Sequence, residues 1–450
     1  MGKLFGTDGI RGVVNAGLDA QLAYQVGLAA AAVLRKEKGG ERPVVTIGKD
    51  TRISSDVLEG ALVAGLCSAG ADVLHLGVFP TPAVAFATVD KAADAGVVIS
   101  ASHNPFEHNG IKIFNGRGVK LSDALENEIE DIILNGVEVP VMTHGDIGRV
   151  TYLDAKERER YLDHLVSTID SDLAGLRIAV DCANGAASAT APALFARFPK
   201  LDCDIFYAEP DGVNINNGCG STHLEALRER MKTGRYDLGL AFDGDADRFL
   251  AVDELGEPID GDQIMAICGS DLMARGELPG NAVVATVMSN LGFRLFTKEH
   301  GMKLEITDVG DRNVLERMLE KGYALGGEQS GHTIFLKHAT TGDGQLSALQ
   351  LLQVLKKSGR RASELAAMCA VYPQMLINVP VADKAAKERI MASDALAKAV
   401  AGTEQSLGDR GRVLVRPSGT EALVRVMVEA AEDAEAREMA EALANVIKNL

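Results

Sequence analysis

Three aspartates at alternate positions form the clearest candidate for chemistry in this chain. Asp243, Asp245 and Asp247 are separated only by a glycine and an alanine. This spacing can gather carboxylate oxygens around one cation, and such hard ligands suit Mg²⁺, which usually also binds phosphate oxygens. Without a cation, three clustered carboxylates would repel one another strongly. The segment therefore predicts a magnesium site.

Two other interpretations of the acidic segment agree less well with its flanks. A solvated acidic turn is disfavoured because the apolar run 238–242 precedes it and predicts a buried strand. An EF-hand loop starting at Asp243 would have Glu254 at position 12. It would also have Arg248 at position 6, where the tight turn of an EF-hand requires glycine.

The second candidate is Ser102, in the segment Ser-Ala-Ser-His-Asn-Pro at 100–105. The segment lacks the G-x-S-x-G pattern of hydrolase nucleophiles, and its Asn-Pro pair favours a plain turn. Next to a metal site, however, a serine hydroxyl can accept a phosphoryl group while the cation neutralises the transferring oxygens. Lys112 follows on the next predicted strand and could bring a proton donor or base near the serine.

Three further polar segments could bind a phosphorylated sugar. The glycine-rich segment 326–332 carries Glu, Gln and Ser, which can bind sugar hydroxyls, although a simple hairpin has the same composition. Segment 416–420 combines an arginine, two hydroxyls and a glycine, which suit a phosphate cradle or a capped turn. Segment 6–12 places Arg11 in a similar turn, where it could reach a phosphate.

These loops need a scaffold, and the pattern of the chain predicts one. Short β-branched runs alternate with amphipathic helices in three successive units, which is typical of α/β domains. One of the expected helices covers 186–198 in the second unit. In each unit a strand runs directly into one of the polar loops: 95–99 into 100–105, 238–242 into 243–248, and 323–326 into 327–332. Because open α/β sheets bind ligands at the carboxyl ends of their strands, the three loops could converge on one cleft.

We therefore expect an α/β protein with four domains. The first three are mixed or parallel α/β domains of similar topology, and the fourth is a smaller α+β domain. The predicted domains, with the loop each contributes, are 1–153 (serine), 154–256 (metal), 257–370 (sugar) and 371–450 (phosphate).

Composition limits the function further. The formal net charge is −17, which argues against nucleic acid or an anionic membrane surface as a partner. No apolar run approaches the ~18–20 residues of a membrane span, and no signal peptide is evident, so we expect a cytoplasmic protein. The six cysteines are scattered without a zinc spacing and are expected to be reduced thiols. Because the net charge is negative, an anionic substrate would need a binding site with locally concentrated positive charge.

Five segments in this order resemble the α-D-phosphohexomutase family across essentially the whole chain: GTDGIRG, SASHNP, DGDADR, GGEQSGH and RPSGT. The resemblance implies four domains around a deep cleft and a mutase that acts on a sugar phosphate. It implies one Mg²⁺ ion and a phosphorylated Ser102, with a hexose bisphosphate as a candidate activator. How Ser102 is first phosphorylated, and the oligomeric state, stay open.

The resemblance also implies a role for each matching residue. The metal ligands would be Asp243, Asp245, Asp247 and the phosphorylated Ser102. The substrate-binding residues would be Glu328 and Ser330 for the sugar hydroxyls, and Arg416, Ser418, Gly419, Thr420 and Arg425 for the phosphate that is not transferred. The other active-site positions would be Arg11, Lys112, Arg248 and His332, with Lys112 favoured as general base.

Within the family, Gln329 and the chain length are similar to the branch that interconverts glucosamine 6-phosphate and glucosamine 1-phosphate. The alternative is the phosphomannomutase/phosphoglucomutase branch, which typically has methionine at this position. A metal-dependent phosphatase with a serine nucleophile would not need a second phosphate cradle. A non-catalytic sugar-phosphate binder would need neither Ser102 nor the three aspartates.

Overall fold

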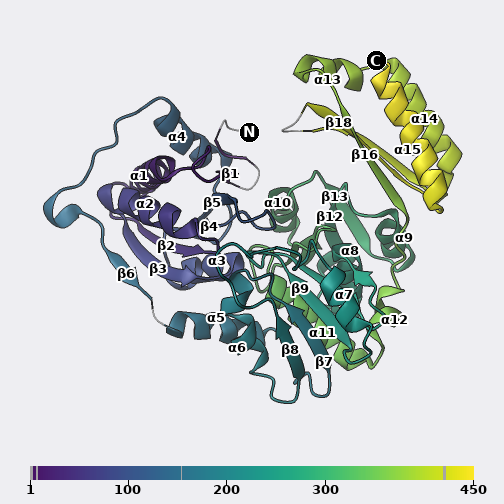
Figure 1. Ribbon diagram of the computed structural model, residues 1–450, viewed down its shortest axis with the longest axis horizontal. Coiled ribbons are helices and arrows are strands. Elements are labelled where there is room, and N and C mark those ends of the chain that lie inside the picture. Colours follow the sequence, from purple (N-terminus) through teal and green to yellow (C-terminus); the bar gives the residue numbers. More distant parts are fainter. Residues whose placement is uncertain (1–3, 7–8, 154, 419–421) are drawn as a thin grey trace. The chain divides into compact units, whose positions relative to one another are not determined.

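The computed structural model describes residues 4–6, 9–153, 155–418 and 422–450, and Figure 1 shows its elements. The chain forms two compact units. The first contains Met1–Met288 and Met302–Met368, and the second contains Ser289–Gly301 and Cys369–Leu450. Within the described part of the chain, no helix combines the length and apolar character that a membrane crossing requires.

The first sheet of the larger unit has six strands in the order β1-β5-β4-β2-β3-β6. Its strands are β1 (Ile10–Val13), β2 (Val44–Lys49), β3 (Asp72–Val78), β4 (Ala95–Ile99), β5 (His108–Asn115) and β6 (Val150–Tyr152). The accompanying helices are α1 (Ala20–Glu37), α2 (Ser55–Ser68), α3 (Thr81–Asp90) and α4 (Asp123–Leu134). The centre is parallel, with β2 between β3 and β4, whereas β5 runs antiparallel to both β4 and β1.

The second sheet has five strands in the order β11-β10-β9-β7-β8. Its strands are β7 (Arg177–Asp181), β8 (Asp202–Phe206), β9 (Leu238–Phe242), β10 (Phe249–Asp253) and β11 (Pro258–Ile259). Its helices are α5 (Ala155–Ser167), α6 (Ala191–Phe195) and α7 (Glu225–Met231). The long helix expected over 186–198 is a 3₁₀ turn followed by the short α6, because Pro192 has no N–H to continue a helix from the preceding turn.

The third sheet has four strands in the order β13-β12-β14-β15. Its strands are β12 (Ala282–Thr286), β13 (Lys303–Thr307), β14 (Leu325–Gly327) and β15 (Thr333–Phe335). Its helices are α8 (Gly261–Ala274), α10 (Asp311–Lys321), α11 (Gly344–Ser358) and α12 (Ala362–Ala366).

The three sheets repeat one feature that matters for function. The strand before each polar loop pairs with the strand after it in an antiparallel manner: β4 with β5, β9 with β10, and β14 with β15. In β9, for example, all five residues are buried and Asp243 follows directly, so the aspartate loop begins in the protein interior. The expected α/β class with repeated topology is confirmed.

The second unit is a small antiparallel sheet covered by helices. Its strands are β16 (Gln374–Pro380), β17 (Arg412–Pro417) and β18 (Leu423–Glu429), in the order β16-β18-β17. Its helices are α9 (Leu291–Glu299), α13 (Lys384–Met391), α14 (Asp394–Leu407) and α15 (Asp433–Lys448).

Helix α9 reaches this unit from a distant part of the sequence. The carboxylate of Glu429 is fully buried and accepts a hydrogen bond from the Leu291 N–H at 2.9 Å, across 138 residues of chain. Glu429 also pairs with the Arg412 guanidinium at 2.9 Å. The second unit is therefore built from two separated segments.

Candidate active site

The serine loop (100–105) and the aspartate loop (243–248) meet in the structure. Ser102 follows β4, and its Oγ donates a 2.5 Å hydrogen bond to Oδ2 of Asp243, which follows β9. Thr81, at the start of α3, donates from its hydroxyl to Asp245 Oδ2 at 2.7 Å and from its N–H to the Asp245 carbonyl at 2.9 Å. Two sheets of the larger unit thus place their loop residues in direct contact.

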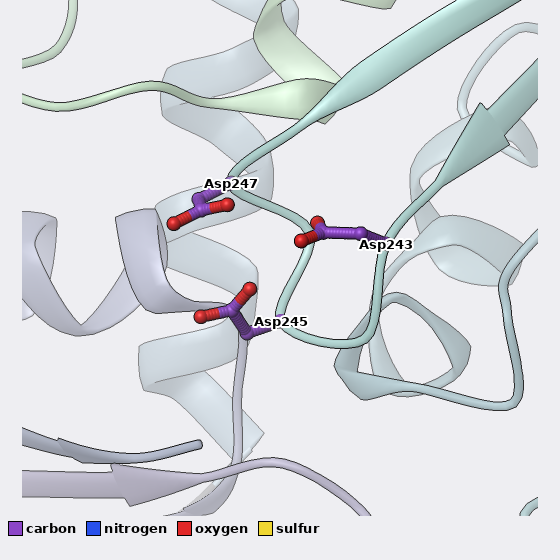
Figure 2. Close-up of side chains that lie close together, drawn as sticks. All are labelled: Asp243, Asp245 and Asp247. Carbon is purple, nitrogen blue, oxygen red and sulfur yellow. The ribbon is translucent and has the colours of Figure 1, made fainter. Parts of the chain in front are cut away.

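The three aspartates form a buried cluster on one loop, as Figure 2 shows. One carboxylate oxygen from each of Asp243, Asp245 and Asp247 lies within 4.8 Å of the others. Among the described residues, the buried Oδ1 atoms of Asp245 and Asp247 have no hydrogen-bond partner. A buried acceptor without a partner is costly, so these oxygens suit a cation.

Lys112 supplies positive charge to this cluster from β5. Its Nζ lies 2.8 Å from Asp245 Oδ2 and 3.2 Å from Asp247 Oδ2, and the side chain is buried. Burial raises the pKa of Asp245, but the Lys112 charge and the hydrogen bonds from Lys112 and Thr81 outweigh it, so that pKa is lowered. Burial and the neighbouring carboxylates of Asp247 and Asp245 raise the pKa of Asp243 well above its usual value.

Arg248 and His103 contact each other next to the serine. The Arg248 N–H donates to Asp243 Oδ1 at 3.1 Å, and its Nη1 lies 3.2 Å from His103 Nδ1. Burial and the charges of Arg248 and Arg11 lower the pKa of His103 to about 4. The imidazole is therefore neutral near pH 7, and its Nδ1 accepts from the guanidinium, which can only donate. His103 lies within the SASHNP segment, but nothing in its spacing predicted a role for it.

The predicted sugar loop is the turn between β14 and β15. Glu328 Oε1 accepts from the Gly310 N–H at 3.2 Å, and burial raises the pKa of this glutamate. Ser330 is exposed at the tip of the turn. The Gln329 amide donates to Asp260 Oδ2 at 3.0 Å, so it anchors the turn to the N-cap of α8.

His332 and the segment after β15 connect the sugar loop to the aspartate loop. Nε2 of the buried His332 accepts from the Gly342 N–H at 3.2 Å and lies 3.7 Å from Asp311 Oδ2. The Gly344 N–H donates to the carbonyl of Ala246, inside the aspartate loop, at 3.0 Å. All three polar loops are thus joined by hydrogen bonds.

The predicted phosphate loop belongs to the second unit. Arg416 lies directly opposite Arg425 in the β17–β18 ladder, and burial and the Arg425 charge lower the pKa of Arg416. The Ser418 carbonyl accepts from Lys387 Nζ at 2.5 Å. Paired like charges repel, so this arrangement favours an anion. Gly419 and Thr420 lie outside the described residues.

Arg11 lies on β1, opposite Gly110 on the strand that carries Lys112. The larger unit therefore contains Ser102, the three aspartates, Lys112, Arg11, Arg248, Glu328, Ser330 and His332. The second unit contains Arg416, Ser418 and Arg425.

Comparison with known proteins defines the class of this chain. Models of the four phosphoglucomutase/phosphomannomutase domains match it in order: α/β/α domain I at residues 2–139, domain II at 159–256, domain III at 260–372 and the C-terminal domain at 376–446. The chain belongs to this family, and it is an isomerase of the mutase class.

Individual relatives carry a more specific name than the family. It is 52% identical over 450 residues to the phosphoglucosamine mutase of Caldanaerobacter subterraneus subsp. tengcongensis, covering 100% of this chain and 99% of the relative. It is 54% identical over 430 residues to that of Acetivibrio thermocellus, covering 95% of each. Among solved structures, a phosphoglucomutase/phosphomannomutase family protein from Burkholderia thailandensis has the same fold, with a TM-score of 0.82, 24% identity, and coverage of 99% of this chain and 97% of that one.

Proposed function

We propose that this chain interconverts glucosamine 6-phosphate and glucosamine 1-phosphate through a phosphorylated Ser102. The observation that carries the proposal is the Ser102 hydroxyl, 2.5 Å from the Asp243 carboxylate within a buried three-aspartate cluster. The amino-sugar preference is supported by identities of 49–54% to relatives named phosphoglucosamine mutase.

A magnesium ion suits the aspartate cluster. Asp243, Asp245 and Asp247 would hold it together with the oxygen of Ser102, because these groups are hard oxygen donors and two of their buried oxygens lack partners in the described structure. Another protein of this fold, Aspergillus fumigatus N-acetylphosphoglucosamine mutase, has been solved in complex with GlcNAc-6P and magnesium. When bound, the ion would neutralise charge on the transferring phosphoryl oxygens.

The chain's own residues would orient the substrate and move its proton. Glu328 and Ser330 would bind sugar hydroxyls, and the Arg416 loop would hold the phosphate that is not transferred. Ser102 would give its phosphoryl group to O1 of glucosamine 6-phosphate, breaking the serine O–P bond and forming the sugar O–P bond. The resulting bisphosphate would turn over and return its 6-phosphoryl group to Ser102.

Lys112 would carry the proton of the O1 hydroxyl at its Nζ. Its Nζ lies within hydrogen-bond distance of two carboxylates, and as an ammonium Lys112 must first lose a proton to act as a base. As an ammonium it can instead donate to the oxygen on which charge develops. A hexose bisphosphate would restore the phosphoserine whenever water removes it.

A parallel assay tests the proposal. The purified, Mg²⁺-supplemented, pre-phosphorylated protein is given glucosamine 6-phosphate, mannose 1-phosphate and glucose 1-phosphate, and we expect the highest kcat/KM on the amino sugar. Preference for a neutral sugar would refute the specificity, and net release of inorganic phosphate would indicate a phosphatase.

Two serine variants test the nucleophile in the same assay. Ser102→Ala should abolish turnover while keeping the fold, as judged by circular dichroism. Ser406→Ala, at an exposed position of α14, should retain full activity and serves as the control. Measurable mutase activity in Ser102→Ala would exclude the phosphoserine route.

A further inference from the structure

We propose that Arg52 and Asn216 are positioning residues that hold the Ser102 loop in the geometry needed for phosphoryl transfer. They bind the same two backbone carbonyls of that loop, Arg52 from the segment after β2 and Asn216 from the loop between β8 and α7. The inference rests on the proposed role of Ser102 as phosphoserine and goes beyond it, because neither residue contacts the reacting hydroxyl.

The Ser102 loop has a backbone conformation that requires support. Ser102 has a φ of +53°, in the left-handed region that side-chain-bearing residues rarely adopt. Within the loop, the Ser102 N–H donates to Ser100 Oγ at 2.9 Å and the Asn104 N–H donates to the Ala101 carbonyl at 3.1 Å. These contacts leave the carbonyls of Ser102 and Asn104 to be bound by residues outside the loop.

Arg52 binds both carbonyls from the first sheet. It follows β2 and is buried, and its Nη2 donates to the Ser102 carbonyl at 3.0 Å and to the Asn104 carbonyl at 2.5 Å. Its Nη1 pairs with the buried Asp50, which also accepts from the Ser55 hydroxyl at 3.1 Å. Because Asp50 neutralises the guanidinium charge locally, the contribution of Arg52 is geometric rather than a charge offered to phosphate.

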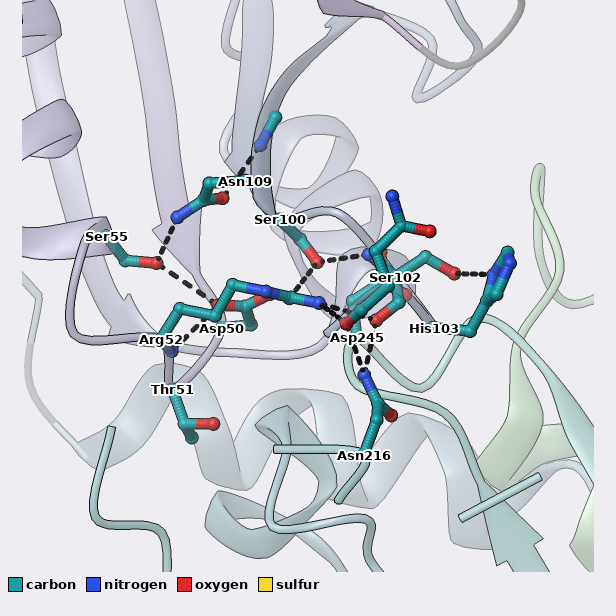
Figure 3. Close-up of polar contacts among 12 residues, drawn as sticks. Asp50, Thr51, Arg52, Ser55, Ser100, Ser102, His103, Asn109, Asn216 and Asp245 are labelled. Atoms are coloured by element: carbon teal, nitrogen blue, oxygen red, sulfur yellow. Dashed lines mark hydrogen bonds and ion pairs between the residues drawn. The ribbon is translucent and has the colours of Figure 1, made fainter. Parts of the chain in front are cut away.

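Asn216 binds the same carbonyls from the loop between β8 and α7, which also belongs to the larger unit. Its Nδ2 donates to the Ser102 carbonyl at 2.9 Å and to the Asn104 carbonyl at 3.1 Å. Figure 3 shows Arg52 and Asn216 approaching the loop from different sides. The aspartate loop packs directly against this hydrogen bond at Gly244. A Cβ built on Gly244 would lie 2.5 Å from the Ser102 carbonyl oxygen and 2.9 Å from Asn216 Nδ2.

The shared carbonyls couple the orientation of Ser102 to the position of the aspartate loop. Four N–H···O contacts fix the peptide planes of Ser102 and Asn104, and with them the direction of the Ser102 side chain toward Asp243. A displacement of about 1 Å at a reacting group can slow a reaction about 10²-fold. The proposed contacts to sugar and phosphate lie on other loops. Removing hydrogen bonds to the Ser102 and Asn104 carbonyls should therefore lower kcat and leave KM nearly unchanged.

Single-turnover transfer from phospho-Ser102 tests the inference, with whichever hexose phosphate the wild type uses fastest. Asn216→Ala should slow transfer about 10²-fold and change KM by less than threefold. Arg52→Lys keeps the positive charge but loses the planar fork by which Nη1 pairs with Asp50 while Nη2 binds both carbonyls, so it should slow transfer at least tenfold. In both variants the ³¹P resonance of the phosphoserine should shift or broaden.

Asn214→Ala is the matched control. This residue lies in the same loop as Asn216, and among the described residues its side-chain amide bonds within that loop, to the Glu209 carbonyl and the Asp211 N–H. Transfer by this variant should stay within threefold of the wild type. Near-wild-type transfer by Asn216→Ala and Arg52→Lys, or an equal loss in Asn214→Ala, would overturn the inference. A wild-type enzyme without any phosphoserine transfer would instead refute the proposed function on which it rests.

Discussion

Replacing Gly342 with alanine should slow catalysis strongly, because a methyl group has no room there. A Cβ at this position would lie 2.5 Å from His332 Cδ2, 2.6 Å from His332 Nε2 and 2.7 Å from the carbonyl oxygen of Asp247. Ordinary contacts between non-bonded heavy atoms begin at about 3.5 Å. The added methyl must therefore push His332 and the aspartate loop apart by roughly 0.8–1 Å.

The size of the effect follows from what must move. His332 is 3% exposed, so its ring cannot swing into solvent, and the Asp247 carbonyl belongs to the proposed metal loop. A displacement of about 1 Å near reacting groups corresponds to a loss of about 10² in kcat/KM, or ~2.7 kcal/mol in the activation barrier. Overpacking should also lower the free energy of unfolding by about 1–3 kcal/mol.

The measurement compares kcat/KM and urea unfolding of Gly342→Ala with those of Gly60→Ala. Gly60 lies inside α2, and a Cβ there would meet no atom within 4 Å. The control should keep its kcat/KM and gain about 0.5–1 kcal/mol of stability, because alanine favours a helix. If Gly342→Ala retained kcat/KM within threefold of the wild type, the close approach of Gly342 to His332 and the Asp247 carbonyl would not position the aspartate loop.

Three further predictions follow from other parts of the chain. Asp247→Asn should raise the Mg²⁺ concentration needed for half-maximal activity at least tenfold, and an unchanged Mg²⁺ titration would contradict the proposed ligand set. Burial raises the pKa of Asp343, the N-cap of α11, to about 6 from 3.8, so the contribution of Asp343 to the free energy of unfolding should fall as pH rises from about 4 to about 6. Asp343→Asn should flatten this dependence in urea unfolding at several pH values; identical curves for both proteins would refute it. Glu429→Gln removes the charge that pairs with Arg412 and should destabilise the second unit by about 3 kcal/mol, detected as faster proteolysis of 369–450; unchanged protease resistance would argue against it.

Much of the fold could be predicted because the sequence pattern is local. Short apolar runs that end in polar loops identified the strands β4, β9 and β14, and the rule that open α/β sheets bind ligands at the carboxyl ends of their strands indicated that these loops could converge. The helix expected over 186–198 was too long, although Pro192 was a visible signal against it.

The supporting residues of the site could not be predicted in the same way. Arg52 also follows a parallel strand at its carboxyl end, so the edge rule could have placed it near the serine. Its partners, however, are backbone carbonyls, which have no signature in the sequence. Asn216 lies in a loop of the second domain 114 residues from Ser102, and only the packed structure brings the two together.

The divided make-up of the second unit has a consequence for the order in which the newly made chain can fold. Helix α9 leaves the ribosome with an apolar face built around Leu291, Phe293 and Phe296, which are buried in the finished protein. Glu429, which accepts the Leu291 N–H and anchors this segment, is synthesised 138 residues later. At about 5–20 residues per second, this delay lasts roughly 7–28 s. During that time the sheets on either side of α9 in the sequence can already be complete, while the helix waits for its partner strand. The first turn of α9 in a newly made chain therefore lacks its carboxylate partner until the last strand emerges, and a ribosome that stalls before residue 429 leaves a product in which this contact cannot form.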